Sequence, residues 1–132
     1  MKNIVLLIVS IFIFAFSCEN DVTSNQHCIS GKIVGQKCDV YALQLDQKIL
    51  GATEWTKKDL VTGEIEATYP NVIGLINLPD EFRADDKIVF VTFREPTTDE
   101  RNISCYTDMP PPPSPYYIVL SASETKCNET ER

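Results

Sequence analysis

The sequence predicts a small all-β domain, and three observations lead to that prediction. Short apolar runs follow one another along the chain, and turn-forming residues separate them about every ten positions. No window of a dozen residues shows the apolar stripe of an amphipathic helix. Runs of this kind close into a small barrel or stack as two sheets. The chain of 132 residues is long enough for one such domain.

The first expected strands alternate between apolar and polar positions. Residues 29–35 open the domain, and residues 40–45 place Tyr41, Leu43 and Leu45 on one face. A third strand is expected in "ILGATEW", which ends at the only tryptophan. After it, "LVTGEIEATY" has a Thr-Gly pair between two β-like runs, which favours a tight turn.

The later strands differ in pattern. The runs "NVIGLINL" and "KIVFVTFR" are apolar at both parities, which is typical of central strands covered on both faces. The final strands are expected in "NISCYT" and "YYIVLSAS", the second with Ile118, Leu120 and Ala122 facing inward. A five- to six-stranded barrel of the oligonucleotide/oligosaccharide-binding (OB) type is our first choice of architecture. An immunoglobulin-like sandwich is the second.

An apolar segment at the N-terminus predicts export. Residues 4–16 contain one polar residue, and this run is shorter than the roughly 20 residues that a membrane-spanning helix needs. A lysine precedes the run and small residues end it, as in a signal peptide. We therefore expect a signal peptide at 1–17, a flexible tether at 18–27, one domain at 28–127 and a polar tail at 128–132.

The residues at the end of this segment, Ala15, Phe16, Ser17 and Cys18, resemble the lipid-attachment signal of bacterial lipoproteins. They depart from the strict pattern, with Ala15 where a leucine or a similar aliphatic residue is usual and a bulky Phe16 after it. The resemblance implies that Cys18 becomes the first mature residue and carries lipid, which anchors the protein to a membrane of the bacterial cell envelope. The periplasmic and outward faces both stay open. The cysteine count agrees, because five is odd and lipid on Cys18 leaves four that can pair. The other interpretation is a secreted protein with a free or intermolecular thiol there.

The four remaining cysteines predict two disulfides, which stabilise small exported domains by about 2–4 kcal/mol each. Three pairings are possible, and we favour Cys28–Cys127 and Cys38–Cys105 because each bond closes a long loop. Metal binding and redox chemistry are disfavoured, since the nearest cysteines lie ten residues apart and the sequence has a single histidine. We expect no metal and no cofactor.

The net charge disfavours some partners. The chain carries 12 basic and 19 acidic residues, a formal charge of −7, and loss of residues 1–17 removes one lysine and no acid, which makes it −8. An acidic surface repels phosphate backbones, so nucleic acid is not an expected partner. Such a surface would attract a basic protein, although solubility alone also explains a net charge of this kind.

Candidate functional residues are few. His27 lies in the expected tether, where it is poorly placed for catalysis. The acids within 80–86 are more typical of a solvated turn than of a catalytic pair or a calcium loop. The run "MPPPPSP" predicts a stiff polyproline segment that either packs as a crossover or binds a partner. Possible binding residues are Trp55, Tyr106, Tyr116 and Tyr117.

Together these observations favour a lipid-anchored, non-enzymatic envelope protein whose β domain binds a macromolecule or a cell-wall component. A second hypothesis is an inhibitor of a basic hydrolase such as a lysozyme, because a small, braced, acidic domain suits electrostatic capture. A third hypothesis is a carboxylate-dependent hydrolase, which would need two acids that converge in a pocket.

Overall fold

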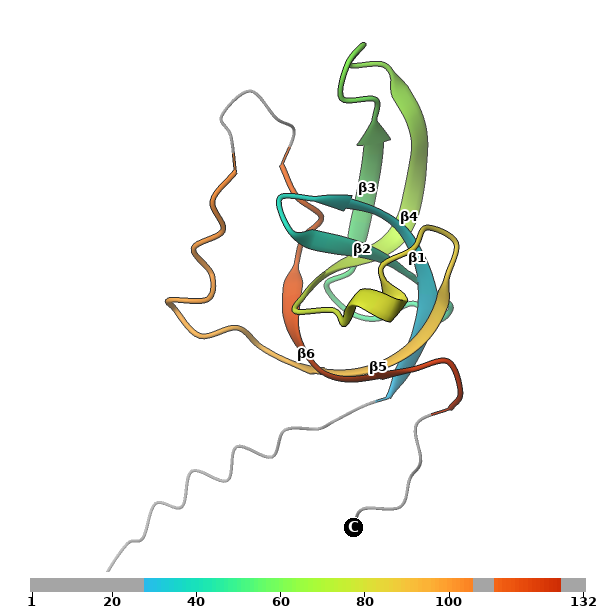
Figure 1. Ribbon diagram of the computed structural model, residues 1–132, viewed down its shortest axis with the longest axis vertical. Coiled ribbons are helices and arrows are strands. Elements are labelled where there is room, and N and C mark those ends of the chain that lie inside the picture. The colour runs from blue at the N-terminus through green and yellow to red at the C-terminus, as the bar shows by residue number, and fades with distance from the viewer. Residues whose placement is uncertain (1–27, 106–110, 127–132) are drawn as a thin grey trace, which may run out of the picture.

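The computed structural model describes residues 28–105 and 111–126, and it contains six β-strands with almost no helix (Figure 1). The strands are β1 (Ile29–Lys37), β2 (Val40–Leu45), β3 (Thr53–Lys58), β4 (Ile65–Ile76), β5 (Ile88–Arg94) and β6 (Tyr116–Ser123), with one 3-10 turn, η1 (Asp80–Phe82), before β5. The all-β prediction is confirmed. Within the described residues, no helix has both the length and the apolar character needed to span a bilayer. The apolar segment 4–16 lies outside them.

All six strands belong to one sheet whose hydrogen bonding runs in a ring. The strand order is β2-β1-β5-β6-β4-β3, and an additional pairing of β2 with β4 closes five of the strands on themselves. Neighbours in the ring are antiparallel except β4 and β6, which are parallel. β3 lies outside the ring and pairs with β4. The β3–β4 hairpin therefore projects from the rest of the molecule (Figure 1).

The inside of the ring holds the main hydrophobic core. Period-two alternation sends one face of each strand inward, and the predicted shared face of Tyr41, Leu43 and Leu45 is confirmed, because all three pack in this core. Phe82 of η1 is also buried there. The other members are Ile33, Ile73, Leu75, Leu78, Val89 and Val91.

A second, smaller cluster lies on the opposite side of the same strands. Val34, Ala42 and Val72 alternate with core residues of β1, β2 and β4, and so face away from the main core. Trp55 of β3 packs over them. β4 is therefore buried on both faces over residues 72–75, as its apolar pattern predicts.

The two strands predicted on either side of Pro70 are one strand, because β4 runs through the proline. A register shift in the β3–β4 pairing at this point accommodates the missing N–H group. Asn71 has a φ of +59° there, and its side-chain amide donates to the carbonyls of Leu45 and Gln47 at 3.0 and 2.9 Å. These bonds fix the bend that lets β4 pair with both β2 and β3.

Three other strand predictions need correction. β3 begins at Thr53 and not four residues earlier, because residues 46–52 form the connection from β2. Residues 102–105, predicted as part of a strand, have no strand structure. β5 buries Val91 fully but leaves Ile88 exposed, so it is not covered on both faces as predicted.

The last strand reverses its inward face partway along its length. Tyr117 and Val119 pack against the main core, and so does Ala122, whereas Leu120 is 45% exposed. Leu120 is the extra residue at a register shift in the pairing with β5. Such a bulge exchanges the two faces of a strand. The inward prediction is therefore right for Ala122 and wrong for Leu120, while Ile118 is buried but is not part of the main core.

Candidate binding groove

Two neighbouring hollows flank β3 and together form a groove. The first, of about 320 Å³, lies between the end of β1, β3 and the β3–β4 turn, and the second, of about 430 Å³, lies between β3 and residues 111–114. Both are lined by Trp55, Thr56, Lys58 and Pro111, so they adjoin each other along β3. We call this surface the β3 groove. Its size is within the usual range for ligand sites.

Trp55 forms the floor of the groove. Its side chain is 8% exposed and stacks on Tyr69, with 6.4 Å between the ring centroids and 19° between the ring planes. The ring can lie against β1 because Gly35 has no side chain: a Cβ atom there would be 2.9 Å from Cη2 of the tryptophan. Trp55 is the only tryptophan of the chain, so its fluorescence reports on the groove.

The proline-rich segment forms one wall of the groove. Pro113 is fully buried, and the carbonyl of Pro115 accepts a hydrogen bond from the N–H of Gly74 at 2.7 Å. The hydroxyl of Thr53 donates to the carbonyl of Ser114 at 2.5 Å, which joins this segment to β3. In contrast, Pro111 is exposed and lines both hollows. The segment thus packs as a crossover at one end and offers an exposed face at the other.

A disulfide ties together the two connections that border the groove. Cys38 lies in the β1–β2 turn and Cys105 in the β5–β6 connection, with 5.4 Å between their Cα atoms. This predicted pair is confirmed. Cys28 is also disulfide-bonded, but its predicted partner Cys127 lies outside the described residues, as does Cys18. The Cys28–Cys127 pairing therefore stays a prediction.

Several charged side chains at the first hollow have partners. Nζ of Lys57 lies 2.7 Å from a carboxylate oxygen of Asp85 and 3.6 Å from one of Glu66. The hydrogen bond with Asp85 raises the pKa of Lys57 above its ordinary value. Oδ1 of Asp59 accepts hydrogen bonds from two backbone N–H groups of the β3–β4 turn, at 2.6 Å from Thr62 and at 2.8 Å from the residue before it. Both bonds lower the pKa of Asp59 below its ordinary value, and the bond from Thr62 has the larger effect.

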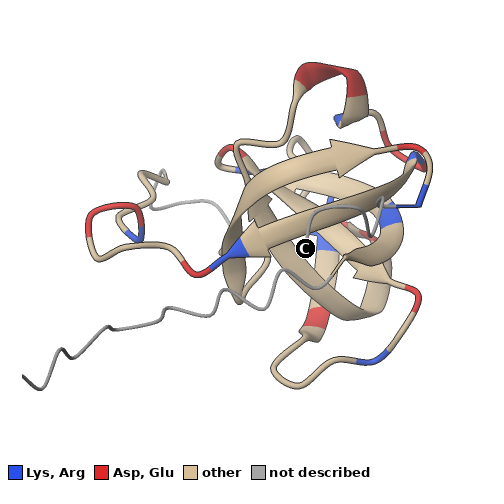
Figure 2. Ribbon diagram, turned by 90° about the horizontal axis from the view of Figure 1, so that it is seen from below, with Lys and Arg blue, Asp and Glu red and all other residues tan. Residues whose placement is uncertain are grey.

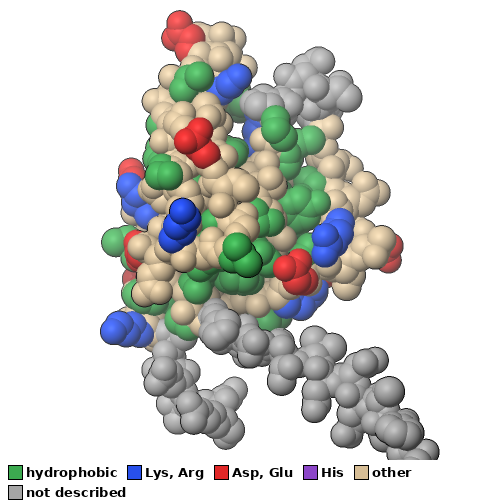
Figure 3. All heavy atoms as spheres, turned by 180° about the vertical axis from the view of Figure 1, so that it is seen from behind, with side chains coloured by type: hydrophobic (Ala, Val, Ile, Leu, Met, Phe, Trp, Pro, Cys, Tyr) green, Lys and Arg blue, Asp and Glu red, His purple; other side chains and the backbone are tan. Residues whose placement is uncertain are grey.

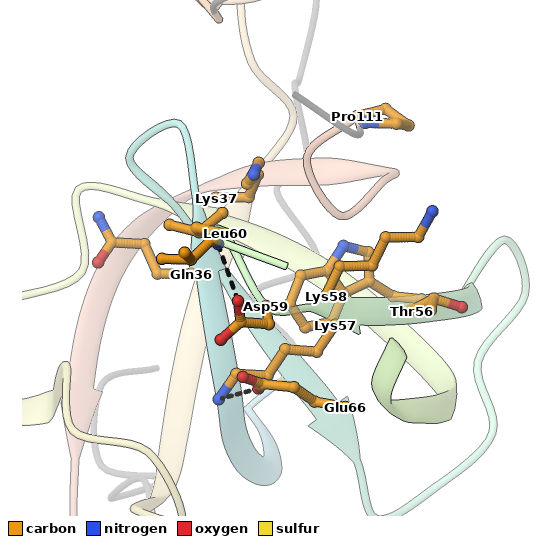
Figure 4. Close-up of a pocket in the computed structure, with 11 residues that line it drawn as sticks. Gln36, Lys37, Thr56, Lys57, Lys58, Asp59, Leu60, Glu66 and Pro111 are labelled. Carbon is orange, nitrogen blue, oxygen red and sulfur yellow. Dashed lines mark hydrogen bonds and ion pairs between the residues drawn. The ribbon is translucent and has the colours of Figure 1, made fainter. Parts of the chain in front are cut away.

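Two lysines at the groove lack such partners. Lys37, the last residue of β1, is 6% exposed, and its Nζ makes no hydrogen bond. Lys58, the last residue of β3, is exposed and forms no ion pair with any described residue. In the view of Figure 4, Lys37 lies on the same side of the hollow as Pro111, and the Lys57–Glu66 pair lies on the other side. No described side chain therefore neutralises the positive charge of Lys37 or Lys58.

Aliphatic side chains of the β3–β4 hairpin add an apolar rim. Leu60 and Val61 line the first hollow and Ile65 lines the second, and all three are exposed. Figure 3 shows the projecting hairpin with hydrophobic side chains on its surface. The groove thus combines an aromatic floor, a proline wall, an aliphatic rim and two unpaired lysines.

The other aromatic candidates lie away from the groove. The hydroxyl of Tyr116 donates to the carbonyl of Arg101 at 2.6 Å, and the ring of Tyr117 packs on that of Phe93 with 4.5 Å between centroids. Burial raises the pKa of Tyr117. Neither tyrosine lines the groove. The remaining candidates, Tyr106 and His27, lie outside the described residues.

The acids between β4 and β5 do not converge in the groove. Asp80, Asp85 and Asp86 each form an ion pair with a lysine or an arginine. Figure 2 shows that acidic residues lie mostly on the loops. Among the residues that the structure describes, no group of three or more His, Cys, Asp or Glu side chains could hold a metal ion.

No protein-family model matches the chain, and no curated protein matches it significantly. The fold and the groove define the class of protein: a small, disulfide-braced β domain with a ring of five hydrogen-bonded strands and an open groove beside the sixth. Its function has to be inferred from that geometry.

Proposed function

We propose that this chain is a lipid-anchored protein of the bacterial cell envelope whose β domain is a non-catalytic binding module, and that the β3 groove holds its ligand. The observation that carries the proposal is the pair of adjoining hollows along β3, which share Trp55 and Pro111 in their lining. The connections beside it come from distant parts of the chain and are tied by the Cys38–Cys105 disulfide. Such a preorganised surface loses little conformational entropy when a ligand binds.

The strand arrangement supports this choice of surface. The ring β1-β2-β4-β6-β5 has as many strands as the five-stranded Greek-key barrel of the OB type, which is the architecture that we propose for it. That fold binds oligosaccharides and oligonucleotides on its second and third strands and on the loops after its first and fourth strands. Because β3 lies outside the ring, the second and third ring strands in chain order are β2 and β4. The corresponding loops are the turn that contains Cys38 and the connection that contains Pro111. Residues of the second of these loops line the β3 groove, and Lys37, which lines its first hollow, comes directly before the first loop.

A cell-wall glycan is the ligand class that fits the groove best. The charge of −8 expected for the mature chain disfavours nucleic acid, the other ligand of this type of fold. The exposed Pro111 and the aliphatic rim supply most of the apolar surface that sugar rings would contact, above the floor formed by Trp55, which is 8% exposed, with polar groups beside this surface for orientation. An open groove also accommodates a polymer that extends beyond the site in both directions.

Co-sedimentation with insoluble cell-wall glycan tests the groove, with full-length protein in neutral detergent. Thr56→Phe places a ring at the junction of both hollows and should weaken binding at least about tenfold, or about 1.4 kcal/mol. Thr98→Phe is the matched control, since Thr98 is exposed on a loop outside the groove, and it should bind like the wild type. Equal binding by Thr56→Phe would exclude the groove as the site. Failure of the wild type to bind would refute the glycan assignment.

The lipid anchor is tested separately. Cys18 lies outside the described residues, so its lipidation rests on the resemblance of the signal to lipoprotein signals. Cys18→Ala removes the residue that is expected to carry the lipid. The protein should then move from the membrane fraction to the soluble fraction, because stable attachment needs two or more acyl chains. Unchanged partitioning would overturn the anchor and would leave the binding module as it is.

The inhibitor hypothesis rests on net charge alone. Electrostatic capture of a basic hydrolase would be strongest at low salt. Titration of a basic lysozyme with excess protein at low ionic strength tests it, and full residual activity would dispose of the idea.

A further inference from the structure

Lys37 places a charged group in an unfavourable environment. Its side chain is 6% exposed, and its Nζ makes no hydrogen bond or ion pair with a described residue. Buried ammonium groups in proteins normally have an acceptor or a counter-ion, because leaving water without one is costly. Lys37 also lines the first hollow of the β3 groove. Lys37 therefore lines a space that an acceptor can enter, while its Nζ is itself closed off from water, so the side chain has to turn toward the hollow to reach a bound group.

More lysines than acids line the hollow. Three lysines and two acids line it, whereas the whole chain has more acids than bases. Both acids are engaged, because Asp59 accepts backbone hydrogen bonds of its own turn and Glu66 pairs with Lys57. Lys58 stands at the rim without an ion pair among the described residues. With Asp85, which also pairs with Lys57, three acids meet the three lysines, so the positive charges that lack a partner among the described residues are those of Lys37 and Lys58.

We propose that this hollow binds one anionic group, a phosphate or a carboxylate, carried by the ligand of the β3 groove. Lys37 donates to the group from the buried side and Lys58 from the rim, through charge-assisted hydrogen bonds. A compact ammonium on a flexible four-carbon stem suits such a group, because its three donors can be redirected toward it. A space of about 320 Å³ holds the anion together with the first atoms of the unit that bears it. The statement that a polymer carries the anionic group rests on the proposed function. The anion site itself is argued from the lysines alone.

Thermal unfolding of the full-length protein tests the inference, with inorganic phosphate and acetate as separate probes. Sodium chloride keeps the ionic strength constant, neutral detergent holds the anchor, and Trp55 fluorescence reports the transition. Each probe that binds only the folded protein should raise the wild-type midpoint in a saturable way. A response to phosphate alone assigns the group as a phosphate, and a response to acetate alone assigns it as a carboxylate.

Three variants isolate the lysines. Lys37→Met keeps the length of the side chain and removes its charge, and it should weaken the apparent affinity at least about tenfold. Lys58→Met should weaken it about threefold, since exposed charges contribute less. Lys48→Met is the control, because Lys48 is exposed in the β2–β3 connection outside the groove, and its response should equal that of the wild type.

The outcomes separate this inference from the proposed function. Equal midpoint shifts in the wild type and in Lys37→Met would show a general salt effect and overturn the anion site. A lack of response to both probes, with glycan binding intact, would overturn the anion site and leave the proposed function. A response that depends on Lys37, without glycan binding, would support the anion site and overturn the choice of polymer.

Discussion

Removal of the Cys38–Cys105 disulfide should be the most destabilising change to the frame of the groove. The double variant Cys38→Ser/Cys105→Ser deletes the covalent link between the β1–β2 turn and the β5–β6 connection. The strands of the ring remain paired without it, because none of their hydrogen bonds involves the sulfur atoms. The main effect of the change therefore falls on the unfolded chain, which gains conformational freedom.

The size of the effect follows from the loop that the bond closes. The two cysteines are separated by 67 positions. Chain-entropy arguments give about 4 kcal/mol of stabilisation at 25 °C for a loop of this length. Small domains have total stabilities of about 5–15 kcal/mol. The double variant should therefore still fold, but it should keep only part of the original free energy of unfolding.

Urea denaturation followed by the fluorescence of Trp55 measures this loss. We expect a lower midpoint and a steeper dependence on urea, since the released chain exposes more surface when it unfolds. Ser104→Ala is the matched control, because Ser104 is exposed beside Cys105, and its midpoint should be unchanged. A loss below about 1 kcal/mol in the double variant would refute the loop-closure argument.

Three further changes test separate parts of the structure. Gly35→Ala puts a methyl group 2.9 Å from the ring of Trp55. It should lower the free energy of unfolding by about 1–3 kcal/mol and shift the tryptophan emission maximum. An unchanged spectrum and urea midpoint would contradict this packing. The hydrogen bonds of Arg94 lower the pKa of Glu100 from 4.5 to about 2, so the pair adds stability above about pH 4.5 that is lost as the pH falls toward 2. Glu100→Gln should therefore lose less of its urea midpoint than the wild type between about pH 6 and about pH 2.5, and equal losses would count against the pair. Lys37→Met should raise the free energy of unfolding by about 1–3 kcal/mol in buffer without phosphate or carboxylate, because it removes a buried charge that has no partner; a fall would show that the ammonium group stabilises the fold.

Alternation predicts strands well where local pattern and burial agree. The inward face of β2 follows directly from Tyr41, Leu43 and Leu45, because one side of that strand faces the ring interior. The same argument fails at Leu120, since the bulge that exposes it depends on how β6 pairs with β5. Pro70 likewise signals a break within the chain, whereas the register shift beside it lets β4 continue.

The groove is less visible in the sequence than the fold. Trp55 is a predicted binding residue that does line the groove, because a single tryptophan at a strand end is a recognisable signal. Lys37 gives no such signal, since a lysine at the end of a strand is ordinarily solvated. Its surroundings come from the β3–β4 hairpin and Pro111, which lie far away in the sequence. Composition predicts a polyproline segment but not that Pro113 is buried while Pro111 is exposed.

The distribution of charge also limits which ligands the groove can select. Near physiological salt the Debye length is about 8 Å, so an anionic group in the first hollow would interact mainly with the charged side chains that line it, of which Lys37 and Lys58 have no partner among the described residues. Charged groups farther along the same polymer would instead meet the acidic residues of the loops (Figure 2). A densely charged polymer is therefore repelled by most of the surface even if one of its groups is bound. A largely neutral glycan with widely spaced anionic groups avoids that repulsion, so the spacing of charges, more than their number, should determine which polymer binds.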